Sequence, residues 1–139
     1  MDKNKSLATE KALNLALKNH QEGNTDIALE FYNQVLMIDP DHFQALNNMG
    51  VIFSNSQEFK KAKDCYEKII EINPNYSEAH NNLGIIFKKL GESKKAKDCY
   101  KKAIEINPNY ADAHNNLGII FKELGENQKA KSCYEKAIA

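Results

Sequence analysis

One stretch decides the fold, residues 77–110, which reads SEAHNNLGIIFKKLGESKKAKDCYKKAIEINPNY. The next segment, 111–139, repeats it with 21 of 29 positions identical, and residues 43–76 repeat the same pattern in the other direction. A fixed period of 34 residues is typical of one supersecondary unit stacked on copies of itself. The chain is therefore expected to form a repeat array in which each unit buries its apolar face against its neighbours.

Proline and glycine mark the ends of the expected helices. Each proline follows an Asp or Asn, and a residue before proline is disfavoured in the helical conformation. The prolines are Pro40, Pro74 and Pro108, and they alternate along the chain with Gly23, Gly91 and Gly125, with Gln57 in the equivalent place of the second repeat. Glycine commonly ends a helix, and apolar residues recur at helical spacing, so the pattern predicts eight helices and no strands. The expected ranges are 7–21, 25–38, 43–55, 59–72, 77–89, 93–106, 111–123 and 127–139.

Polar residues after the prolines are expected to cap the next helices. A capping box pairs a polar residue just before a helix with an acidic or amide residue three positions later. The expected pairs are Asp41 with Gln44, Asn75 with Glu78, and Asn109 with Asp112.

Composition and charge exclude several classes of protein. The 19 basic residues, all lysines, are balanced by 19 acidic ones. Balanced charge without arginine argues against a dedicated nucleic-acid domain. No apolar run reaches the roughly 18 residues of a membrane span, and the N-terminus has no apolar core of a signal peptide. We therefore expect a cytoplasmic protein without a membrane partner.

The cysteines and histidines recur one repeat apart and do not suggest a reactive site. Cys65, Cys99 and Cys133 occupy equivalent positions, which in stacked helices lie about 8–10 Å apart, too far for a disulfide. His80 and His114 have no ligand partner at metal-binding spacing, so they are expected to be hydrogen-bonded core residues. Because no nucleophile–base pair, phosphate loop or carboxylate pair is visible, we expect no catalysis, cofactor, metal or small-molecule substrate.

The recurring positions resemble those of the tetratricopeptide repeat family, whose marks are a large residue, Leu-Gly, an aromatic, Ala, an aromatic, Ala and Pro. In the third repeat these are His80, Leu83, Gly84, Phe87, Ala96, Tyr100, Ala103 and Pro108. The resemblance covers residues 9–139 and implies an all-α fold, a right-handed superhelix of four antiparallel helix pairs. The implied divisions are a lead-in at 1–8, a degenerate first repeat at 9–42, repeats at 43–76 and 77–110, and a shortened fourth repeat at 111–139 without a capping helix.

The same resemblance implies peptide binding along the wall formed by the first helix of each pair. Asparagine is a poor residue inside a helix, yet it recurs there at one position in all four repeats. The residues are Asn14, Asn48, Asn82 and Asn116, and three of them follow Asn47, Asn81 and Asn115. A side-chain amide both donates and accepts, so this row can pair with an extended backbone and is similar to the asparagine ladder of O-linked N-acetylglucosamine transferases. Compositional drift, copied by duplication, is the alternative.

An apolar strip lies three residues past the asparagine row. Val51, Ile85 and Ile119 form it, and they are expected either to contact side chains of a ligand or only to thicken the core. We therefore predict a scaffold that binds an extended peptide or protein segment. The last repeat stops five residues short of the period, so a substrate-recruiting region of a larger enzyme, such as a glycosyltransferase, is the alternative.

Two further surfaces carry predictions of their own. Lysines recur at the start of the second helices, for example Lys60 and Lys61 or Lys94 and Lys95; they are expected to be a solvated face, with nucleic-acid binding as the alternative. The last helix has an apolar face that includes Tyr134 and no successor to cover it, which predicts self-association through that helix.

Overall fold

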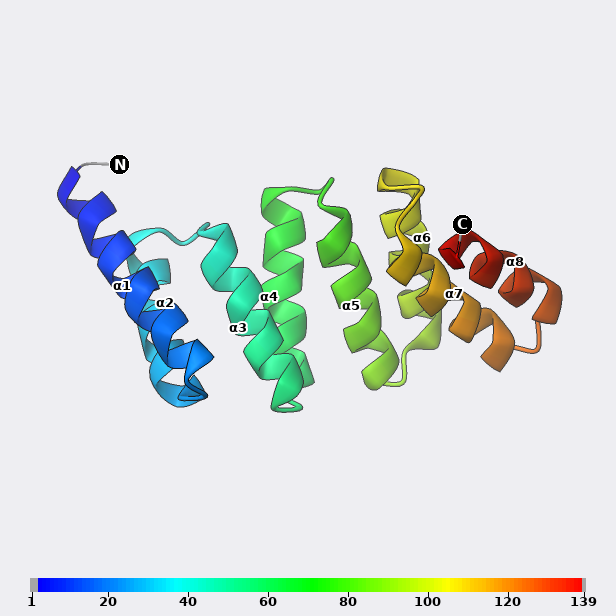
Figure 1. Cartoon of the computed structure of the whole chain (residues 1–139), viewed down its shortest axis with the longest axis horizontal. Helices are drawn as coiled ribbons and strands as arrows, with labels where there is room; N and C mark the ends of the chain where they lie inside the picture. Colours follow the sequence, from blue (N-terminus) through cyan, green and yellow to red (C-terminus); the bar gives the residue numbers. More distant parts are fainter. Residues whose placement is uncertain (1–2, 139) are drawn as a thin grey trace. The chain divides into compact units, whose positions relative to one another are not determined.

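The computed structural model describes residues 3–138, and this range contains eight α-helices and no strand (Figure 1). In chain order they are α1 (Lys3–Gln21), α2 (Thr25–Ile38), α3 (Phe43–Asn55), α4 (Phe59–Ile72), α5 (Ser77–Lys89), α6 (Ser93–Ile106), α7 (Ala111–Glu123) and α8 (Asn127–Ile138). The chain divides into two compact units, Met1–Ile72 (unit 1) and Asn73–Ala139 (unit 2). The predicted all-α class, with helices in packed antiparallel pairs, is confirmed.

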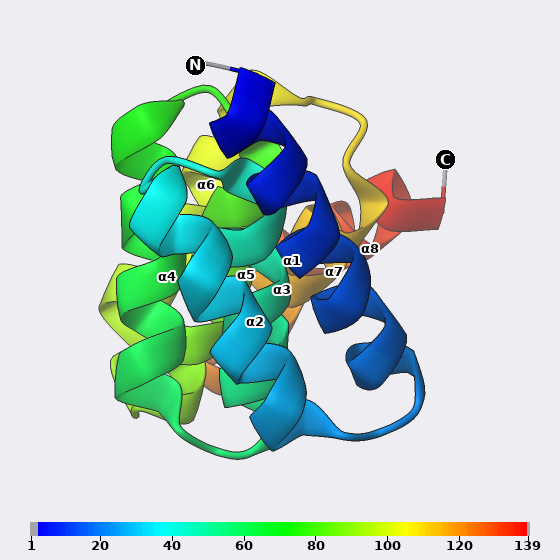
Figure 2. The same ribbon diagram turned by 90° about the vertical axis from the view of Figure 1, so that its left-hand side faces the viewer.

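Packing within each unit is between neighbours. In unit 1, α1 packs against α2, α3 packs against α4, and α2 also contacts α3. Figure 2 shows α1 and α2 running side by side in opposite directions. In unit 2, α5 pairs with α6 and α7 with α8, while α7 contacts both α6 and α5. Each helix therefore contacts its own partner or a helix of the next pair, as expected for a repeat array.

The helix ranges agree closely with those expected, and differ mainly at the N-terminus. The first helix begins at Lys3 rather than at residue 7, so residues 3–8 of the predicted lead-in are helical. The reason is that Lys3–Gln21 contains no Gly or Pro to end the helix. Thr9 lies within it and donates its hydroxyl to the Lys5 carbonyl at 2.8 Å. The predicted last residue of the final helix, Ala139, lies outside the described residues. No helix within 3–138 combines the length and the apolar character that crossing a membrane requires.

The turns at the prolines are closed by the residue that precedes each proline. Asn73 Oδ1 accepts the Asn75 N–H at 3.2 Å, and the Asn73 carbonyl accepts the Tyr76 N–H at 3.2 Å. The same two bonds recur at Asp39 and Asn107. An Asp or Asn side chain that bonds the backbone two residues on is a common turn device, and it explains why α2, α4 and α6 end just before these residues.

The expected capping boxes are wrong. The residue that caps α3 is His42, one position later than expected, and its ring accepts the Ala45 N–H at 3.2 Å. Tyr76 and Tyr110 stand at the N-caps of α5 and α7, and neither makes a side-chain capping bond. The asparagines and the aspartate that were expected to cap follow the prolines and lie inside the proline turns instead.

The turns between paired helices use the left-handed backbone region. Gly23, Gly91 and Gly125 have φ of +82°, +79° and +77°, so the predicted glycine stops are confirmed. Gln57 takes the equivalent place with φ of +61°. A side chain is strained in that region, whereas glycine is not. The turn between α3 and α4 therefore carries local backbone strain that the turn between α5 and α6 does not.

The core consists of the positions that recur in each repeat. In unit 2, Ala96 and Ala103 of α6 are fully buried and Tyr100 is 1% exposed. Phe87 of α5 is buried beside them, and the Tyr100 ring packs against Gly84. Small residues on the paired helices thus leave room for one large ring between them, which is how each helix pair closes on itself.

Candidate functional site

The asparagine row lies on the first helix of each pair, but its members differ in exposure. Asn81 is buried, with 4% exposed, while Asn14 and Asn115 are exposed. The members that are half-buried are Asn47, Asn48, Asn82 and Asn116. The row therefore consists of one buried, four half-buried and two exposed amides.

In unit 2 the row forms a hydrogen bond between neighbouring first helices. Asn116 Nδ2 on α7 donates to Asn81 Oδ1 on α5 at 3.0 Å. The Asn81 amide in turn donates to the Tyr110 hydroxyl, which partly offsets the burial that raises the pKa of Tyr110. The Asn81 side chain therefore interacts with Asn116 and with Tyr110. Asn81 thus fixes the orientation of Asn116, which is half-buried.

In unit 1 the row is connected to a buried tyrosine. The Asn48 amide donates to the Tyr32 hydroxyl, which opposes the dominant effect of burial in raising the pKa of Tyr32. The same hydroxyl is hydrogen-bonded to His20 Nδ1 at 3.1 Å. Asn47 Oδ1 is buried and has no hydrogen-bond partner among residues 3–138. Such an acceptor costs free energy unless a donor reaches it.

Tyr32 and His20 were not identified from the sequence as neighbours of the row. Tyr32 stands at the aromatic position that fills the core of each repeat, and it is fully buried. Its hydroxyl also takes part in hydrogen bonding, and only the packing of α2 on α3 brings this hydroxyl to Asn48.

The apolar strip separates into buried and half-buried positions. Val51, Ile85 and Ile119 are half-buried. The residues that follow each of them are almost fully buried, namely Ile52 at 2%, Ile86 at 1% and Ile120 at 0%. The core thus takes the second residue of each pair, and the first remains half-buried.

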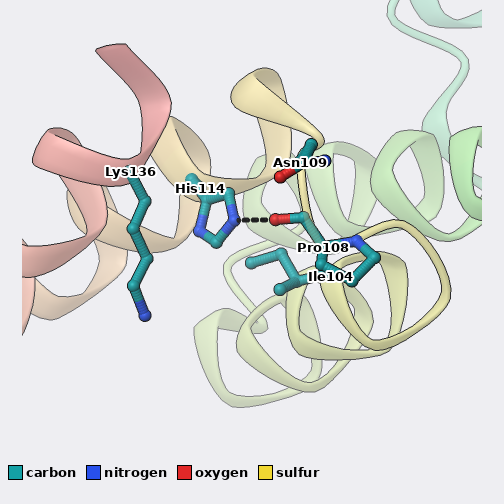
Figure 3. Close-up of a pocket in the computed structure, with 5 residues that line it drawn as sticks. All are labelled: Ile104, Pro108, Asn109, His114 and Lys136. Atoms are coloured by element: carbon teal, nitrogen blue, oxygen red, sulfur yellow. Dashed lines mark hydrogen bonds between the residues drawn. The ribbon is translucent and has the colours of Figure 1, made fainter. Parts of the chain in front are cut away.

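The histidines are hydrogen-bonded core residues, as expected. His80 Nε2 donates to the Pro74 carbonyl at 2.8 Å, and His114 Nε2 donates to the Pro108 carbonyl at 2.7 Å (Figure 3). Each ring thereby holds the start of a first helix to the proline turn before it. Within residues 3–138 no three His, Cys, Asp or Glu side chains gather in a way that would hold a metal ion.

The three cysteines are free thiols in buried or half-buried positions. Burial, helped by the charge of Asp64, raises the pKa of Cys65 to about 11. Burial also raises the pKa of Cys133, although Lys136 opposes it. Thiols with raised pKa values are poor nucleophiles at neutral pH, so neither residue is equipped for catalysis.

Unit 2 also contains a hollow that sequence reasoning missed. Its volume is about 450 Å³, and it is lined by Ile104, Pro108, Asn109, His114 and Lys136 (Figure 3). Ile104 is on α6, His114 on α7 and Lys136 on α8, so three helices and one turn contribute. Residues this far apart in the chain give no local motif, and their spacing could not reveal the hollow.

Comparisons with known proteins agree with this architecture. Models of the tetratricopeptide repeat match residues 12–42, 43–76, 77–110 and 99–132. No curated protein sequence matches the chain.

Solved structures of MamA have the same fold. One crystal structure of MamA is 25% identical with a TM-score of 0.86, covering 94% of this chain and 76% of that one. A second, of MamA residues 41 to the end from Desulfovibrio magneticus RS-1, is 20% identical with a TM-score of 0.84, covering 94% and 73%. The repeat pattern, the paired helices and the matching family models agree, and the chain belongs to the tetratricopeptide repeat family.

Proposed function

We propose that this chain is a protein-interaction scaffold, and that the first helices hold an extended peptide or protein segment. The asparagine row supplies hydrogen bonds to the ligand backbone, and the apolar strip of Val51, Ile85 and Ile119 contacts its side chains. Tetratricopeptide repeats generally bind proteins, which supports the class of partner. The proposal includes a cytoplasmic location and a ladder similar to that of O-linked N-acetylglucosamine transferases.

The observation that carries the proposal is the bond between Asn116 and Asn81 at 3.0 Å. Asparagine that accumulated only by compositional drift would have no reason to form an ordered bond from one first helix to the next. Here a buried amide orients a half-buried one. Positioned amides bind better than mobile ones because less side-chain entropy is lost when the ligand arrives.

The alternative, a substrate-recruiting part of a larger enzyme, uses the same surface. In that case the bound segment would be the substrate of a domain elsewhere in the protein. No catalytic role is proposed for this chain itself, because its polar side chains form repeating rows and do not converge on one point.

The test is to select peptides that bind the chain from a random display library, and then to measure their affinities for variants. Asn48→Ala, Asn82→Ala and Asn116→Ala together should weaken binding by about tenfold or more, the equivalent of one or two net hydrogen bonds. Because the row contacts the peptide backbone, the loss should be similar for peptides of unrelated sequence. Asn33→Ala, an exposed asparagine on the second helix α2, is the matched control. Unchanged affinity in the triple variant would refute the proposal.

We also propose self-association through α8. Ile138 is 85% exposed, and Tyr134 is half-buried whereas its equivalent Tyr100 is 1% exposed. Within unit 2, α7 packs on α6 at the place that corresponds to this face. A second copy of the chain can cover α8 in the same way, and the oligomeric state tests this.

A further inference from the structure

A groove runs between α6 and α8 in unit 2, with α7 as its floor. The hollow of Figure 3 shares Ile104, His114 and Lys136 with a second hollow of about 300 Å³. The second hollow is also lined by Leu117 and Phe121 of α7. The two hollows therefore form one groove with an apolar floor, large enough to take side chains of a bound segment.

Lysines line both sides of this groove. Lys101 comes from α6, and Lys129 and Lys136 come from α8. The Nζ atoms of Lys101 and Lys129 lie 5.9 Å and 5.6 Å from the centre of the Phe121 ring, so two cations flank one buried aromatic side chain. Figure 3 shows Lys136 extending from α8, with His114 between it and Pro108.

Two of these lysines have no acidic partner among residues 3–138. Lys129 Nζ is paired with Glu126 Oε1 at 3.3 Å. No carboxylate within residues 3–138 lies at ion-pair distance from Lys101 or Lys136. Their positive charges are therefore available to an anionic ligand.

Unit 1 provides an internal reference, because its residues stand two repeats earlier in the same fold. Lys61 lies over Phe53 at 5.5 Å, as Lys129 lies over Phe121. Lys68, the equivalent of Lys136, is not free: its Nζ lies 3.6 Å from Asp41 and 3.9 Å from Glu71. The contact between a lysine and a phenylalanine ring is thus present in both units. Lys68 of unit 1 is paired with carboxylates, whereas its equivalent Lys136 has no such partner among residues 3–138.

Three substitutions between the units all move the groove of unit 2 toward positive charge. Asn33, Asp41 and Asp64 of unit 1 correspond to Lys101, Asn109 and Ser132 of unit 2. Each change removes a carboxylate or adds an ammonium group, and the corresponding residues of unit 2 line the groove. The fold does not need this charge, since unit 1 forms the same helix pairs without it.

We propose that the groove between α6 and α8 binds an acidic protein segment. Carboxylates of the segment pair with Lys101 and Lys136, and an apolar side chain between them packs on Ile104 and the floor formed by α7. A nucleic acid fits less well, because the groove has no arginine and the Phe121 ring that could stack a base is covered by two lysines. This surface is separate from the asparagine row and does not depend on the function proposed for it.

The probe is a short fluorescein-labelled peptide in which glutamates flank a Leu-Phe pair, titrated with the whole chain and followed by fluorescence anisotropy. Two control peptides replace the Leu-Phe pair with Ser-Ser or the glutamates with lysines. We expect both controls to bind at least about tenfold more weakly, because the first lacks the apolar anchor and the second has the wrong charge.

The variant Lys101→Asn, Asn109→Asp and Ser132→Asp gives the groove the residues of unit 1, which the fold already accommodates. It should keep the circular dichroism spectrum and lose at least about tenfold in affinity, since its charge differs by three from that of the parent. The reverse variant, Asn33→Lys, Asp41→Asn and Asp64→Ser, combined with Glu71→Ala so that Lys68 loses both of its carboxylate partners, should create a second site in unit 1. Equal affinity in parent and first variant would overturn the proposal, as would equal binding of the Ser-Ser peptide. Tighter binding of a single-stranded oligonucleotide with the same sensitivity to the variant would show a nucleic-acid site instead.

Discussion

The ring of Tyr100 lies against the Cα of Gly84, so a Cβ on this glycine would stand 2.6 Å from Cε1 of the tyrosine. Real Cβ atoms do not approach a neighbour so closely. The same contact recurs between Gly50 and Tyr66 at 2.8 Å. The glycine therefore sets how closely α5 and α6 approach, and the tyrosine fills the space that the missing side chain leaves.

Gly84→Ala should destabilise the protein by about 1–3 kcal/mol, the usual cost of overpacking a core, because Tyr100 is 1% exposed and cannot move aside. Urea unfolding followed by circular dichroism measures the loss. Gly118→Ala is the matched control: its neighbour Tyr134 is half-buried and can shift toward solvent. An equal loss in the two variants would contradict this account.

Gln57→Gly should stabilise unit 1. Gln57 has φ of +61° where the equivalent Gly91 has +79°. The left-handed region costs a non-glycine residue about 1–2 kcal/mol, while glycine loses about 0.5–1 kcal/mol through the freedom of the unfolded chain. The net gain in the free energy of unfolding should be up to about 1.5 kcal/mol. Gly91→Gln, the reverse change in unit 2, should lower stability by a similar amount, and a gain there would contradict the argument.

The helices could be predicted from the sequence because the residues that end them act locally. Pro40 restricts the residue before it, and Gly23 allows the left-handed conformation that ends a helix, so helix ends follow from their positions alone. The residues that cap the helices were harder to predict than the helix ends. Asp41 has a side chain suited to a cap, but the turn that Asp39 closes places His42 at the cap position instead.

The candidate site was only partly predictable for a different reason. The asparagine row has a period that a single sequence displays, whereas the bond from Asn116 to Asn81 depends on how α5 and α7 pack. The groove between α6 and α8 is even less predictable from a local sequence pattern. Lys101 and Lys136 are one pair of lysines among 19, and only the packing of three helices places both beside one apolar floor.

Alkaline pH should unfold the protein in part through Tyr100. Burial, with smaller effects of Cys99 and Glu123, raises the pKa of its hydroxyl from 10.0 to about 12. The folded state holds this proton more tightly than the unfolded chain, so the stability it contributes is complete below pH 10 and is lost as the pH rises through 12. Tyr100→Phe has no proton to lose, and its free energy of unfolding should fall less between pH 10 and 12. Parallel curves for parent and variant would exclude this cause.

Asn81→Leu tests whether Asn81 positions Asn116 without touching the ligand. The first repeat already has Leu13 at this place. The variant removes the bonds to Asn116 and Tyr110, both of which are half-buried and can bond to water, so stability should fall by only about 1 kcal/mol. Peptide affinity should nevertheless fall about as much as in Asn116→Ala alone. The double variant should lose no more affinity than either single variant. Additive losses would mean that Asn81 acts independently.

The exposed face of α8 should make the chain self-associate. Burying a side chain such as Ile138 stabilises a complex by roughly 1.5–3 kcal/mol, and Tyr134 adds to this when a second copy covers it as α7 covers α6. Sedimentation velocity should therefore show a species larger than the monomer that grows with protein concentration. Tyr134→Lys with Ile138→Glu should sediment as a monomer, and α5 and α6 should keep their stability because contacts in repeat arrays are between neighbours. Met37→Glu, which changes an equally exposed apolar residue on α2, should leave the association intact. A parent chain that stays monomeric at high concentration would rule out this role for α8.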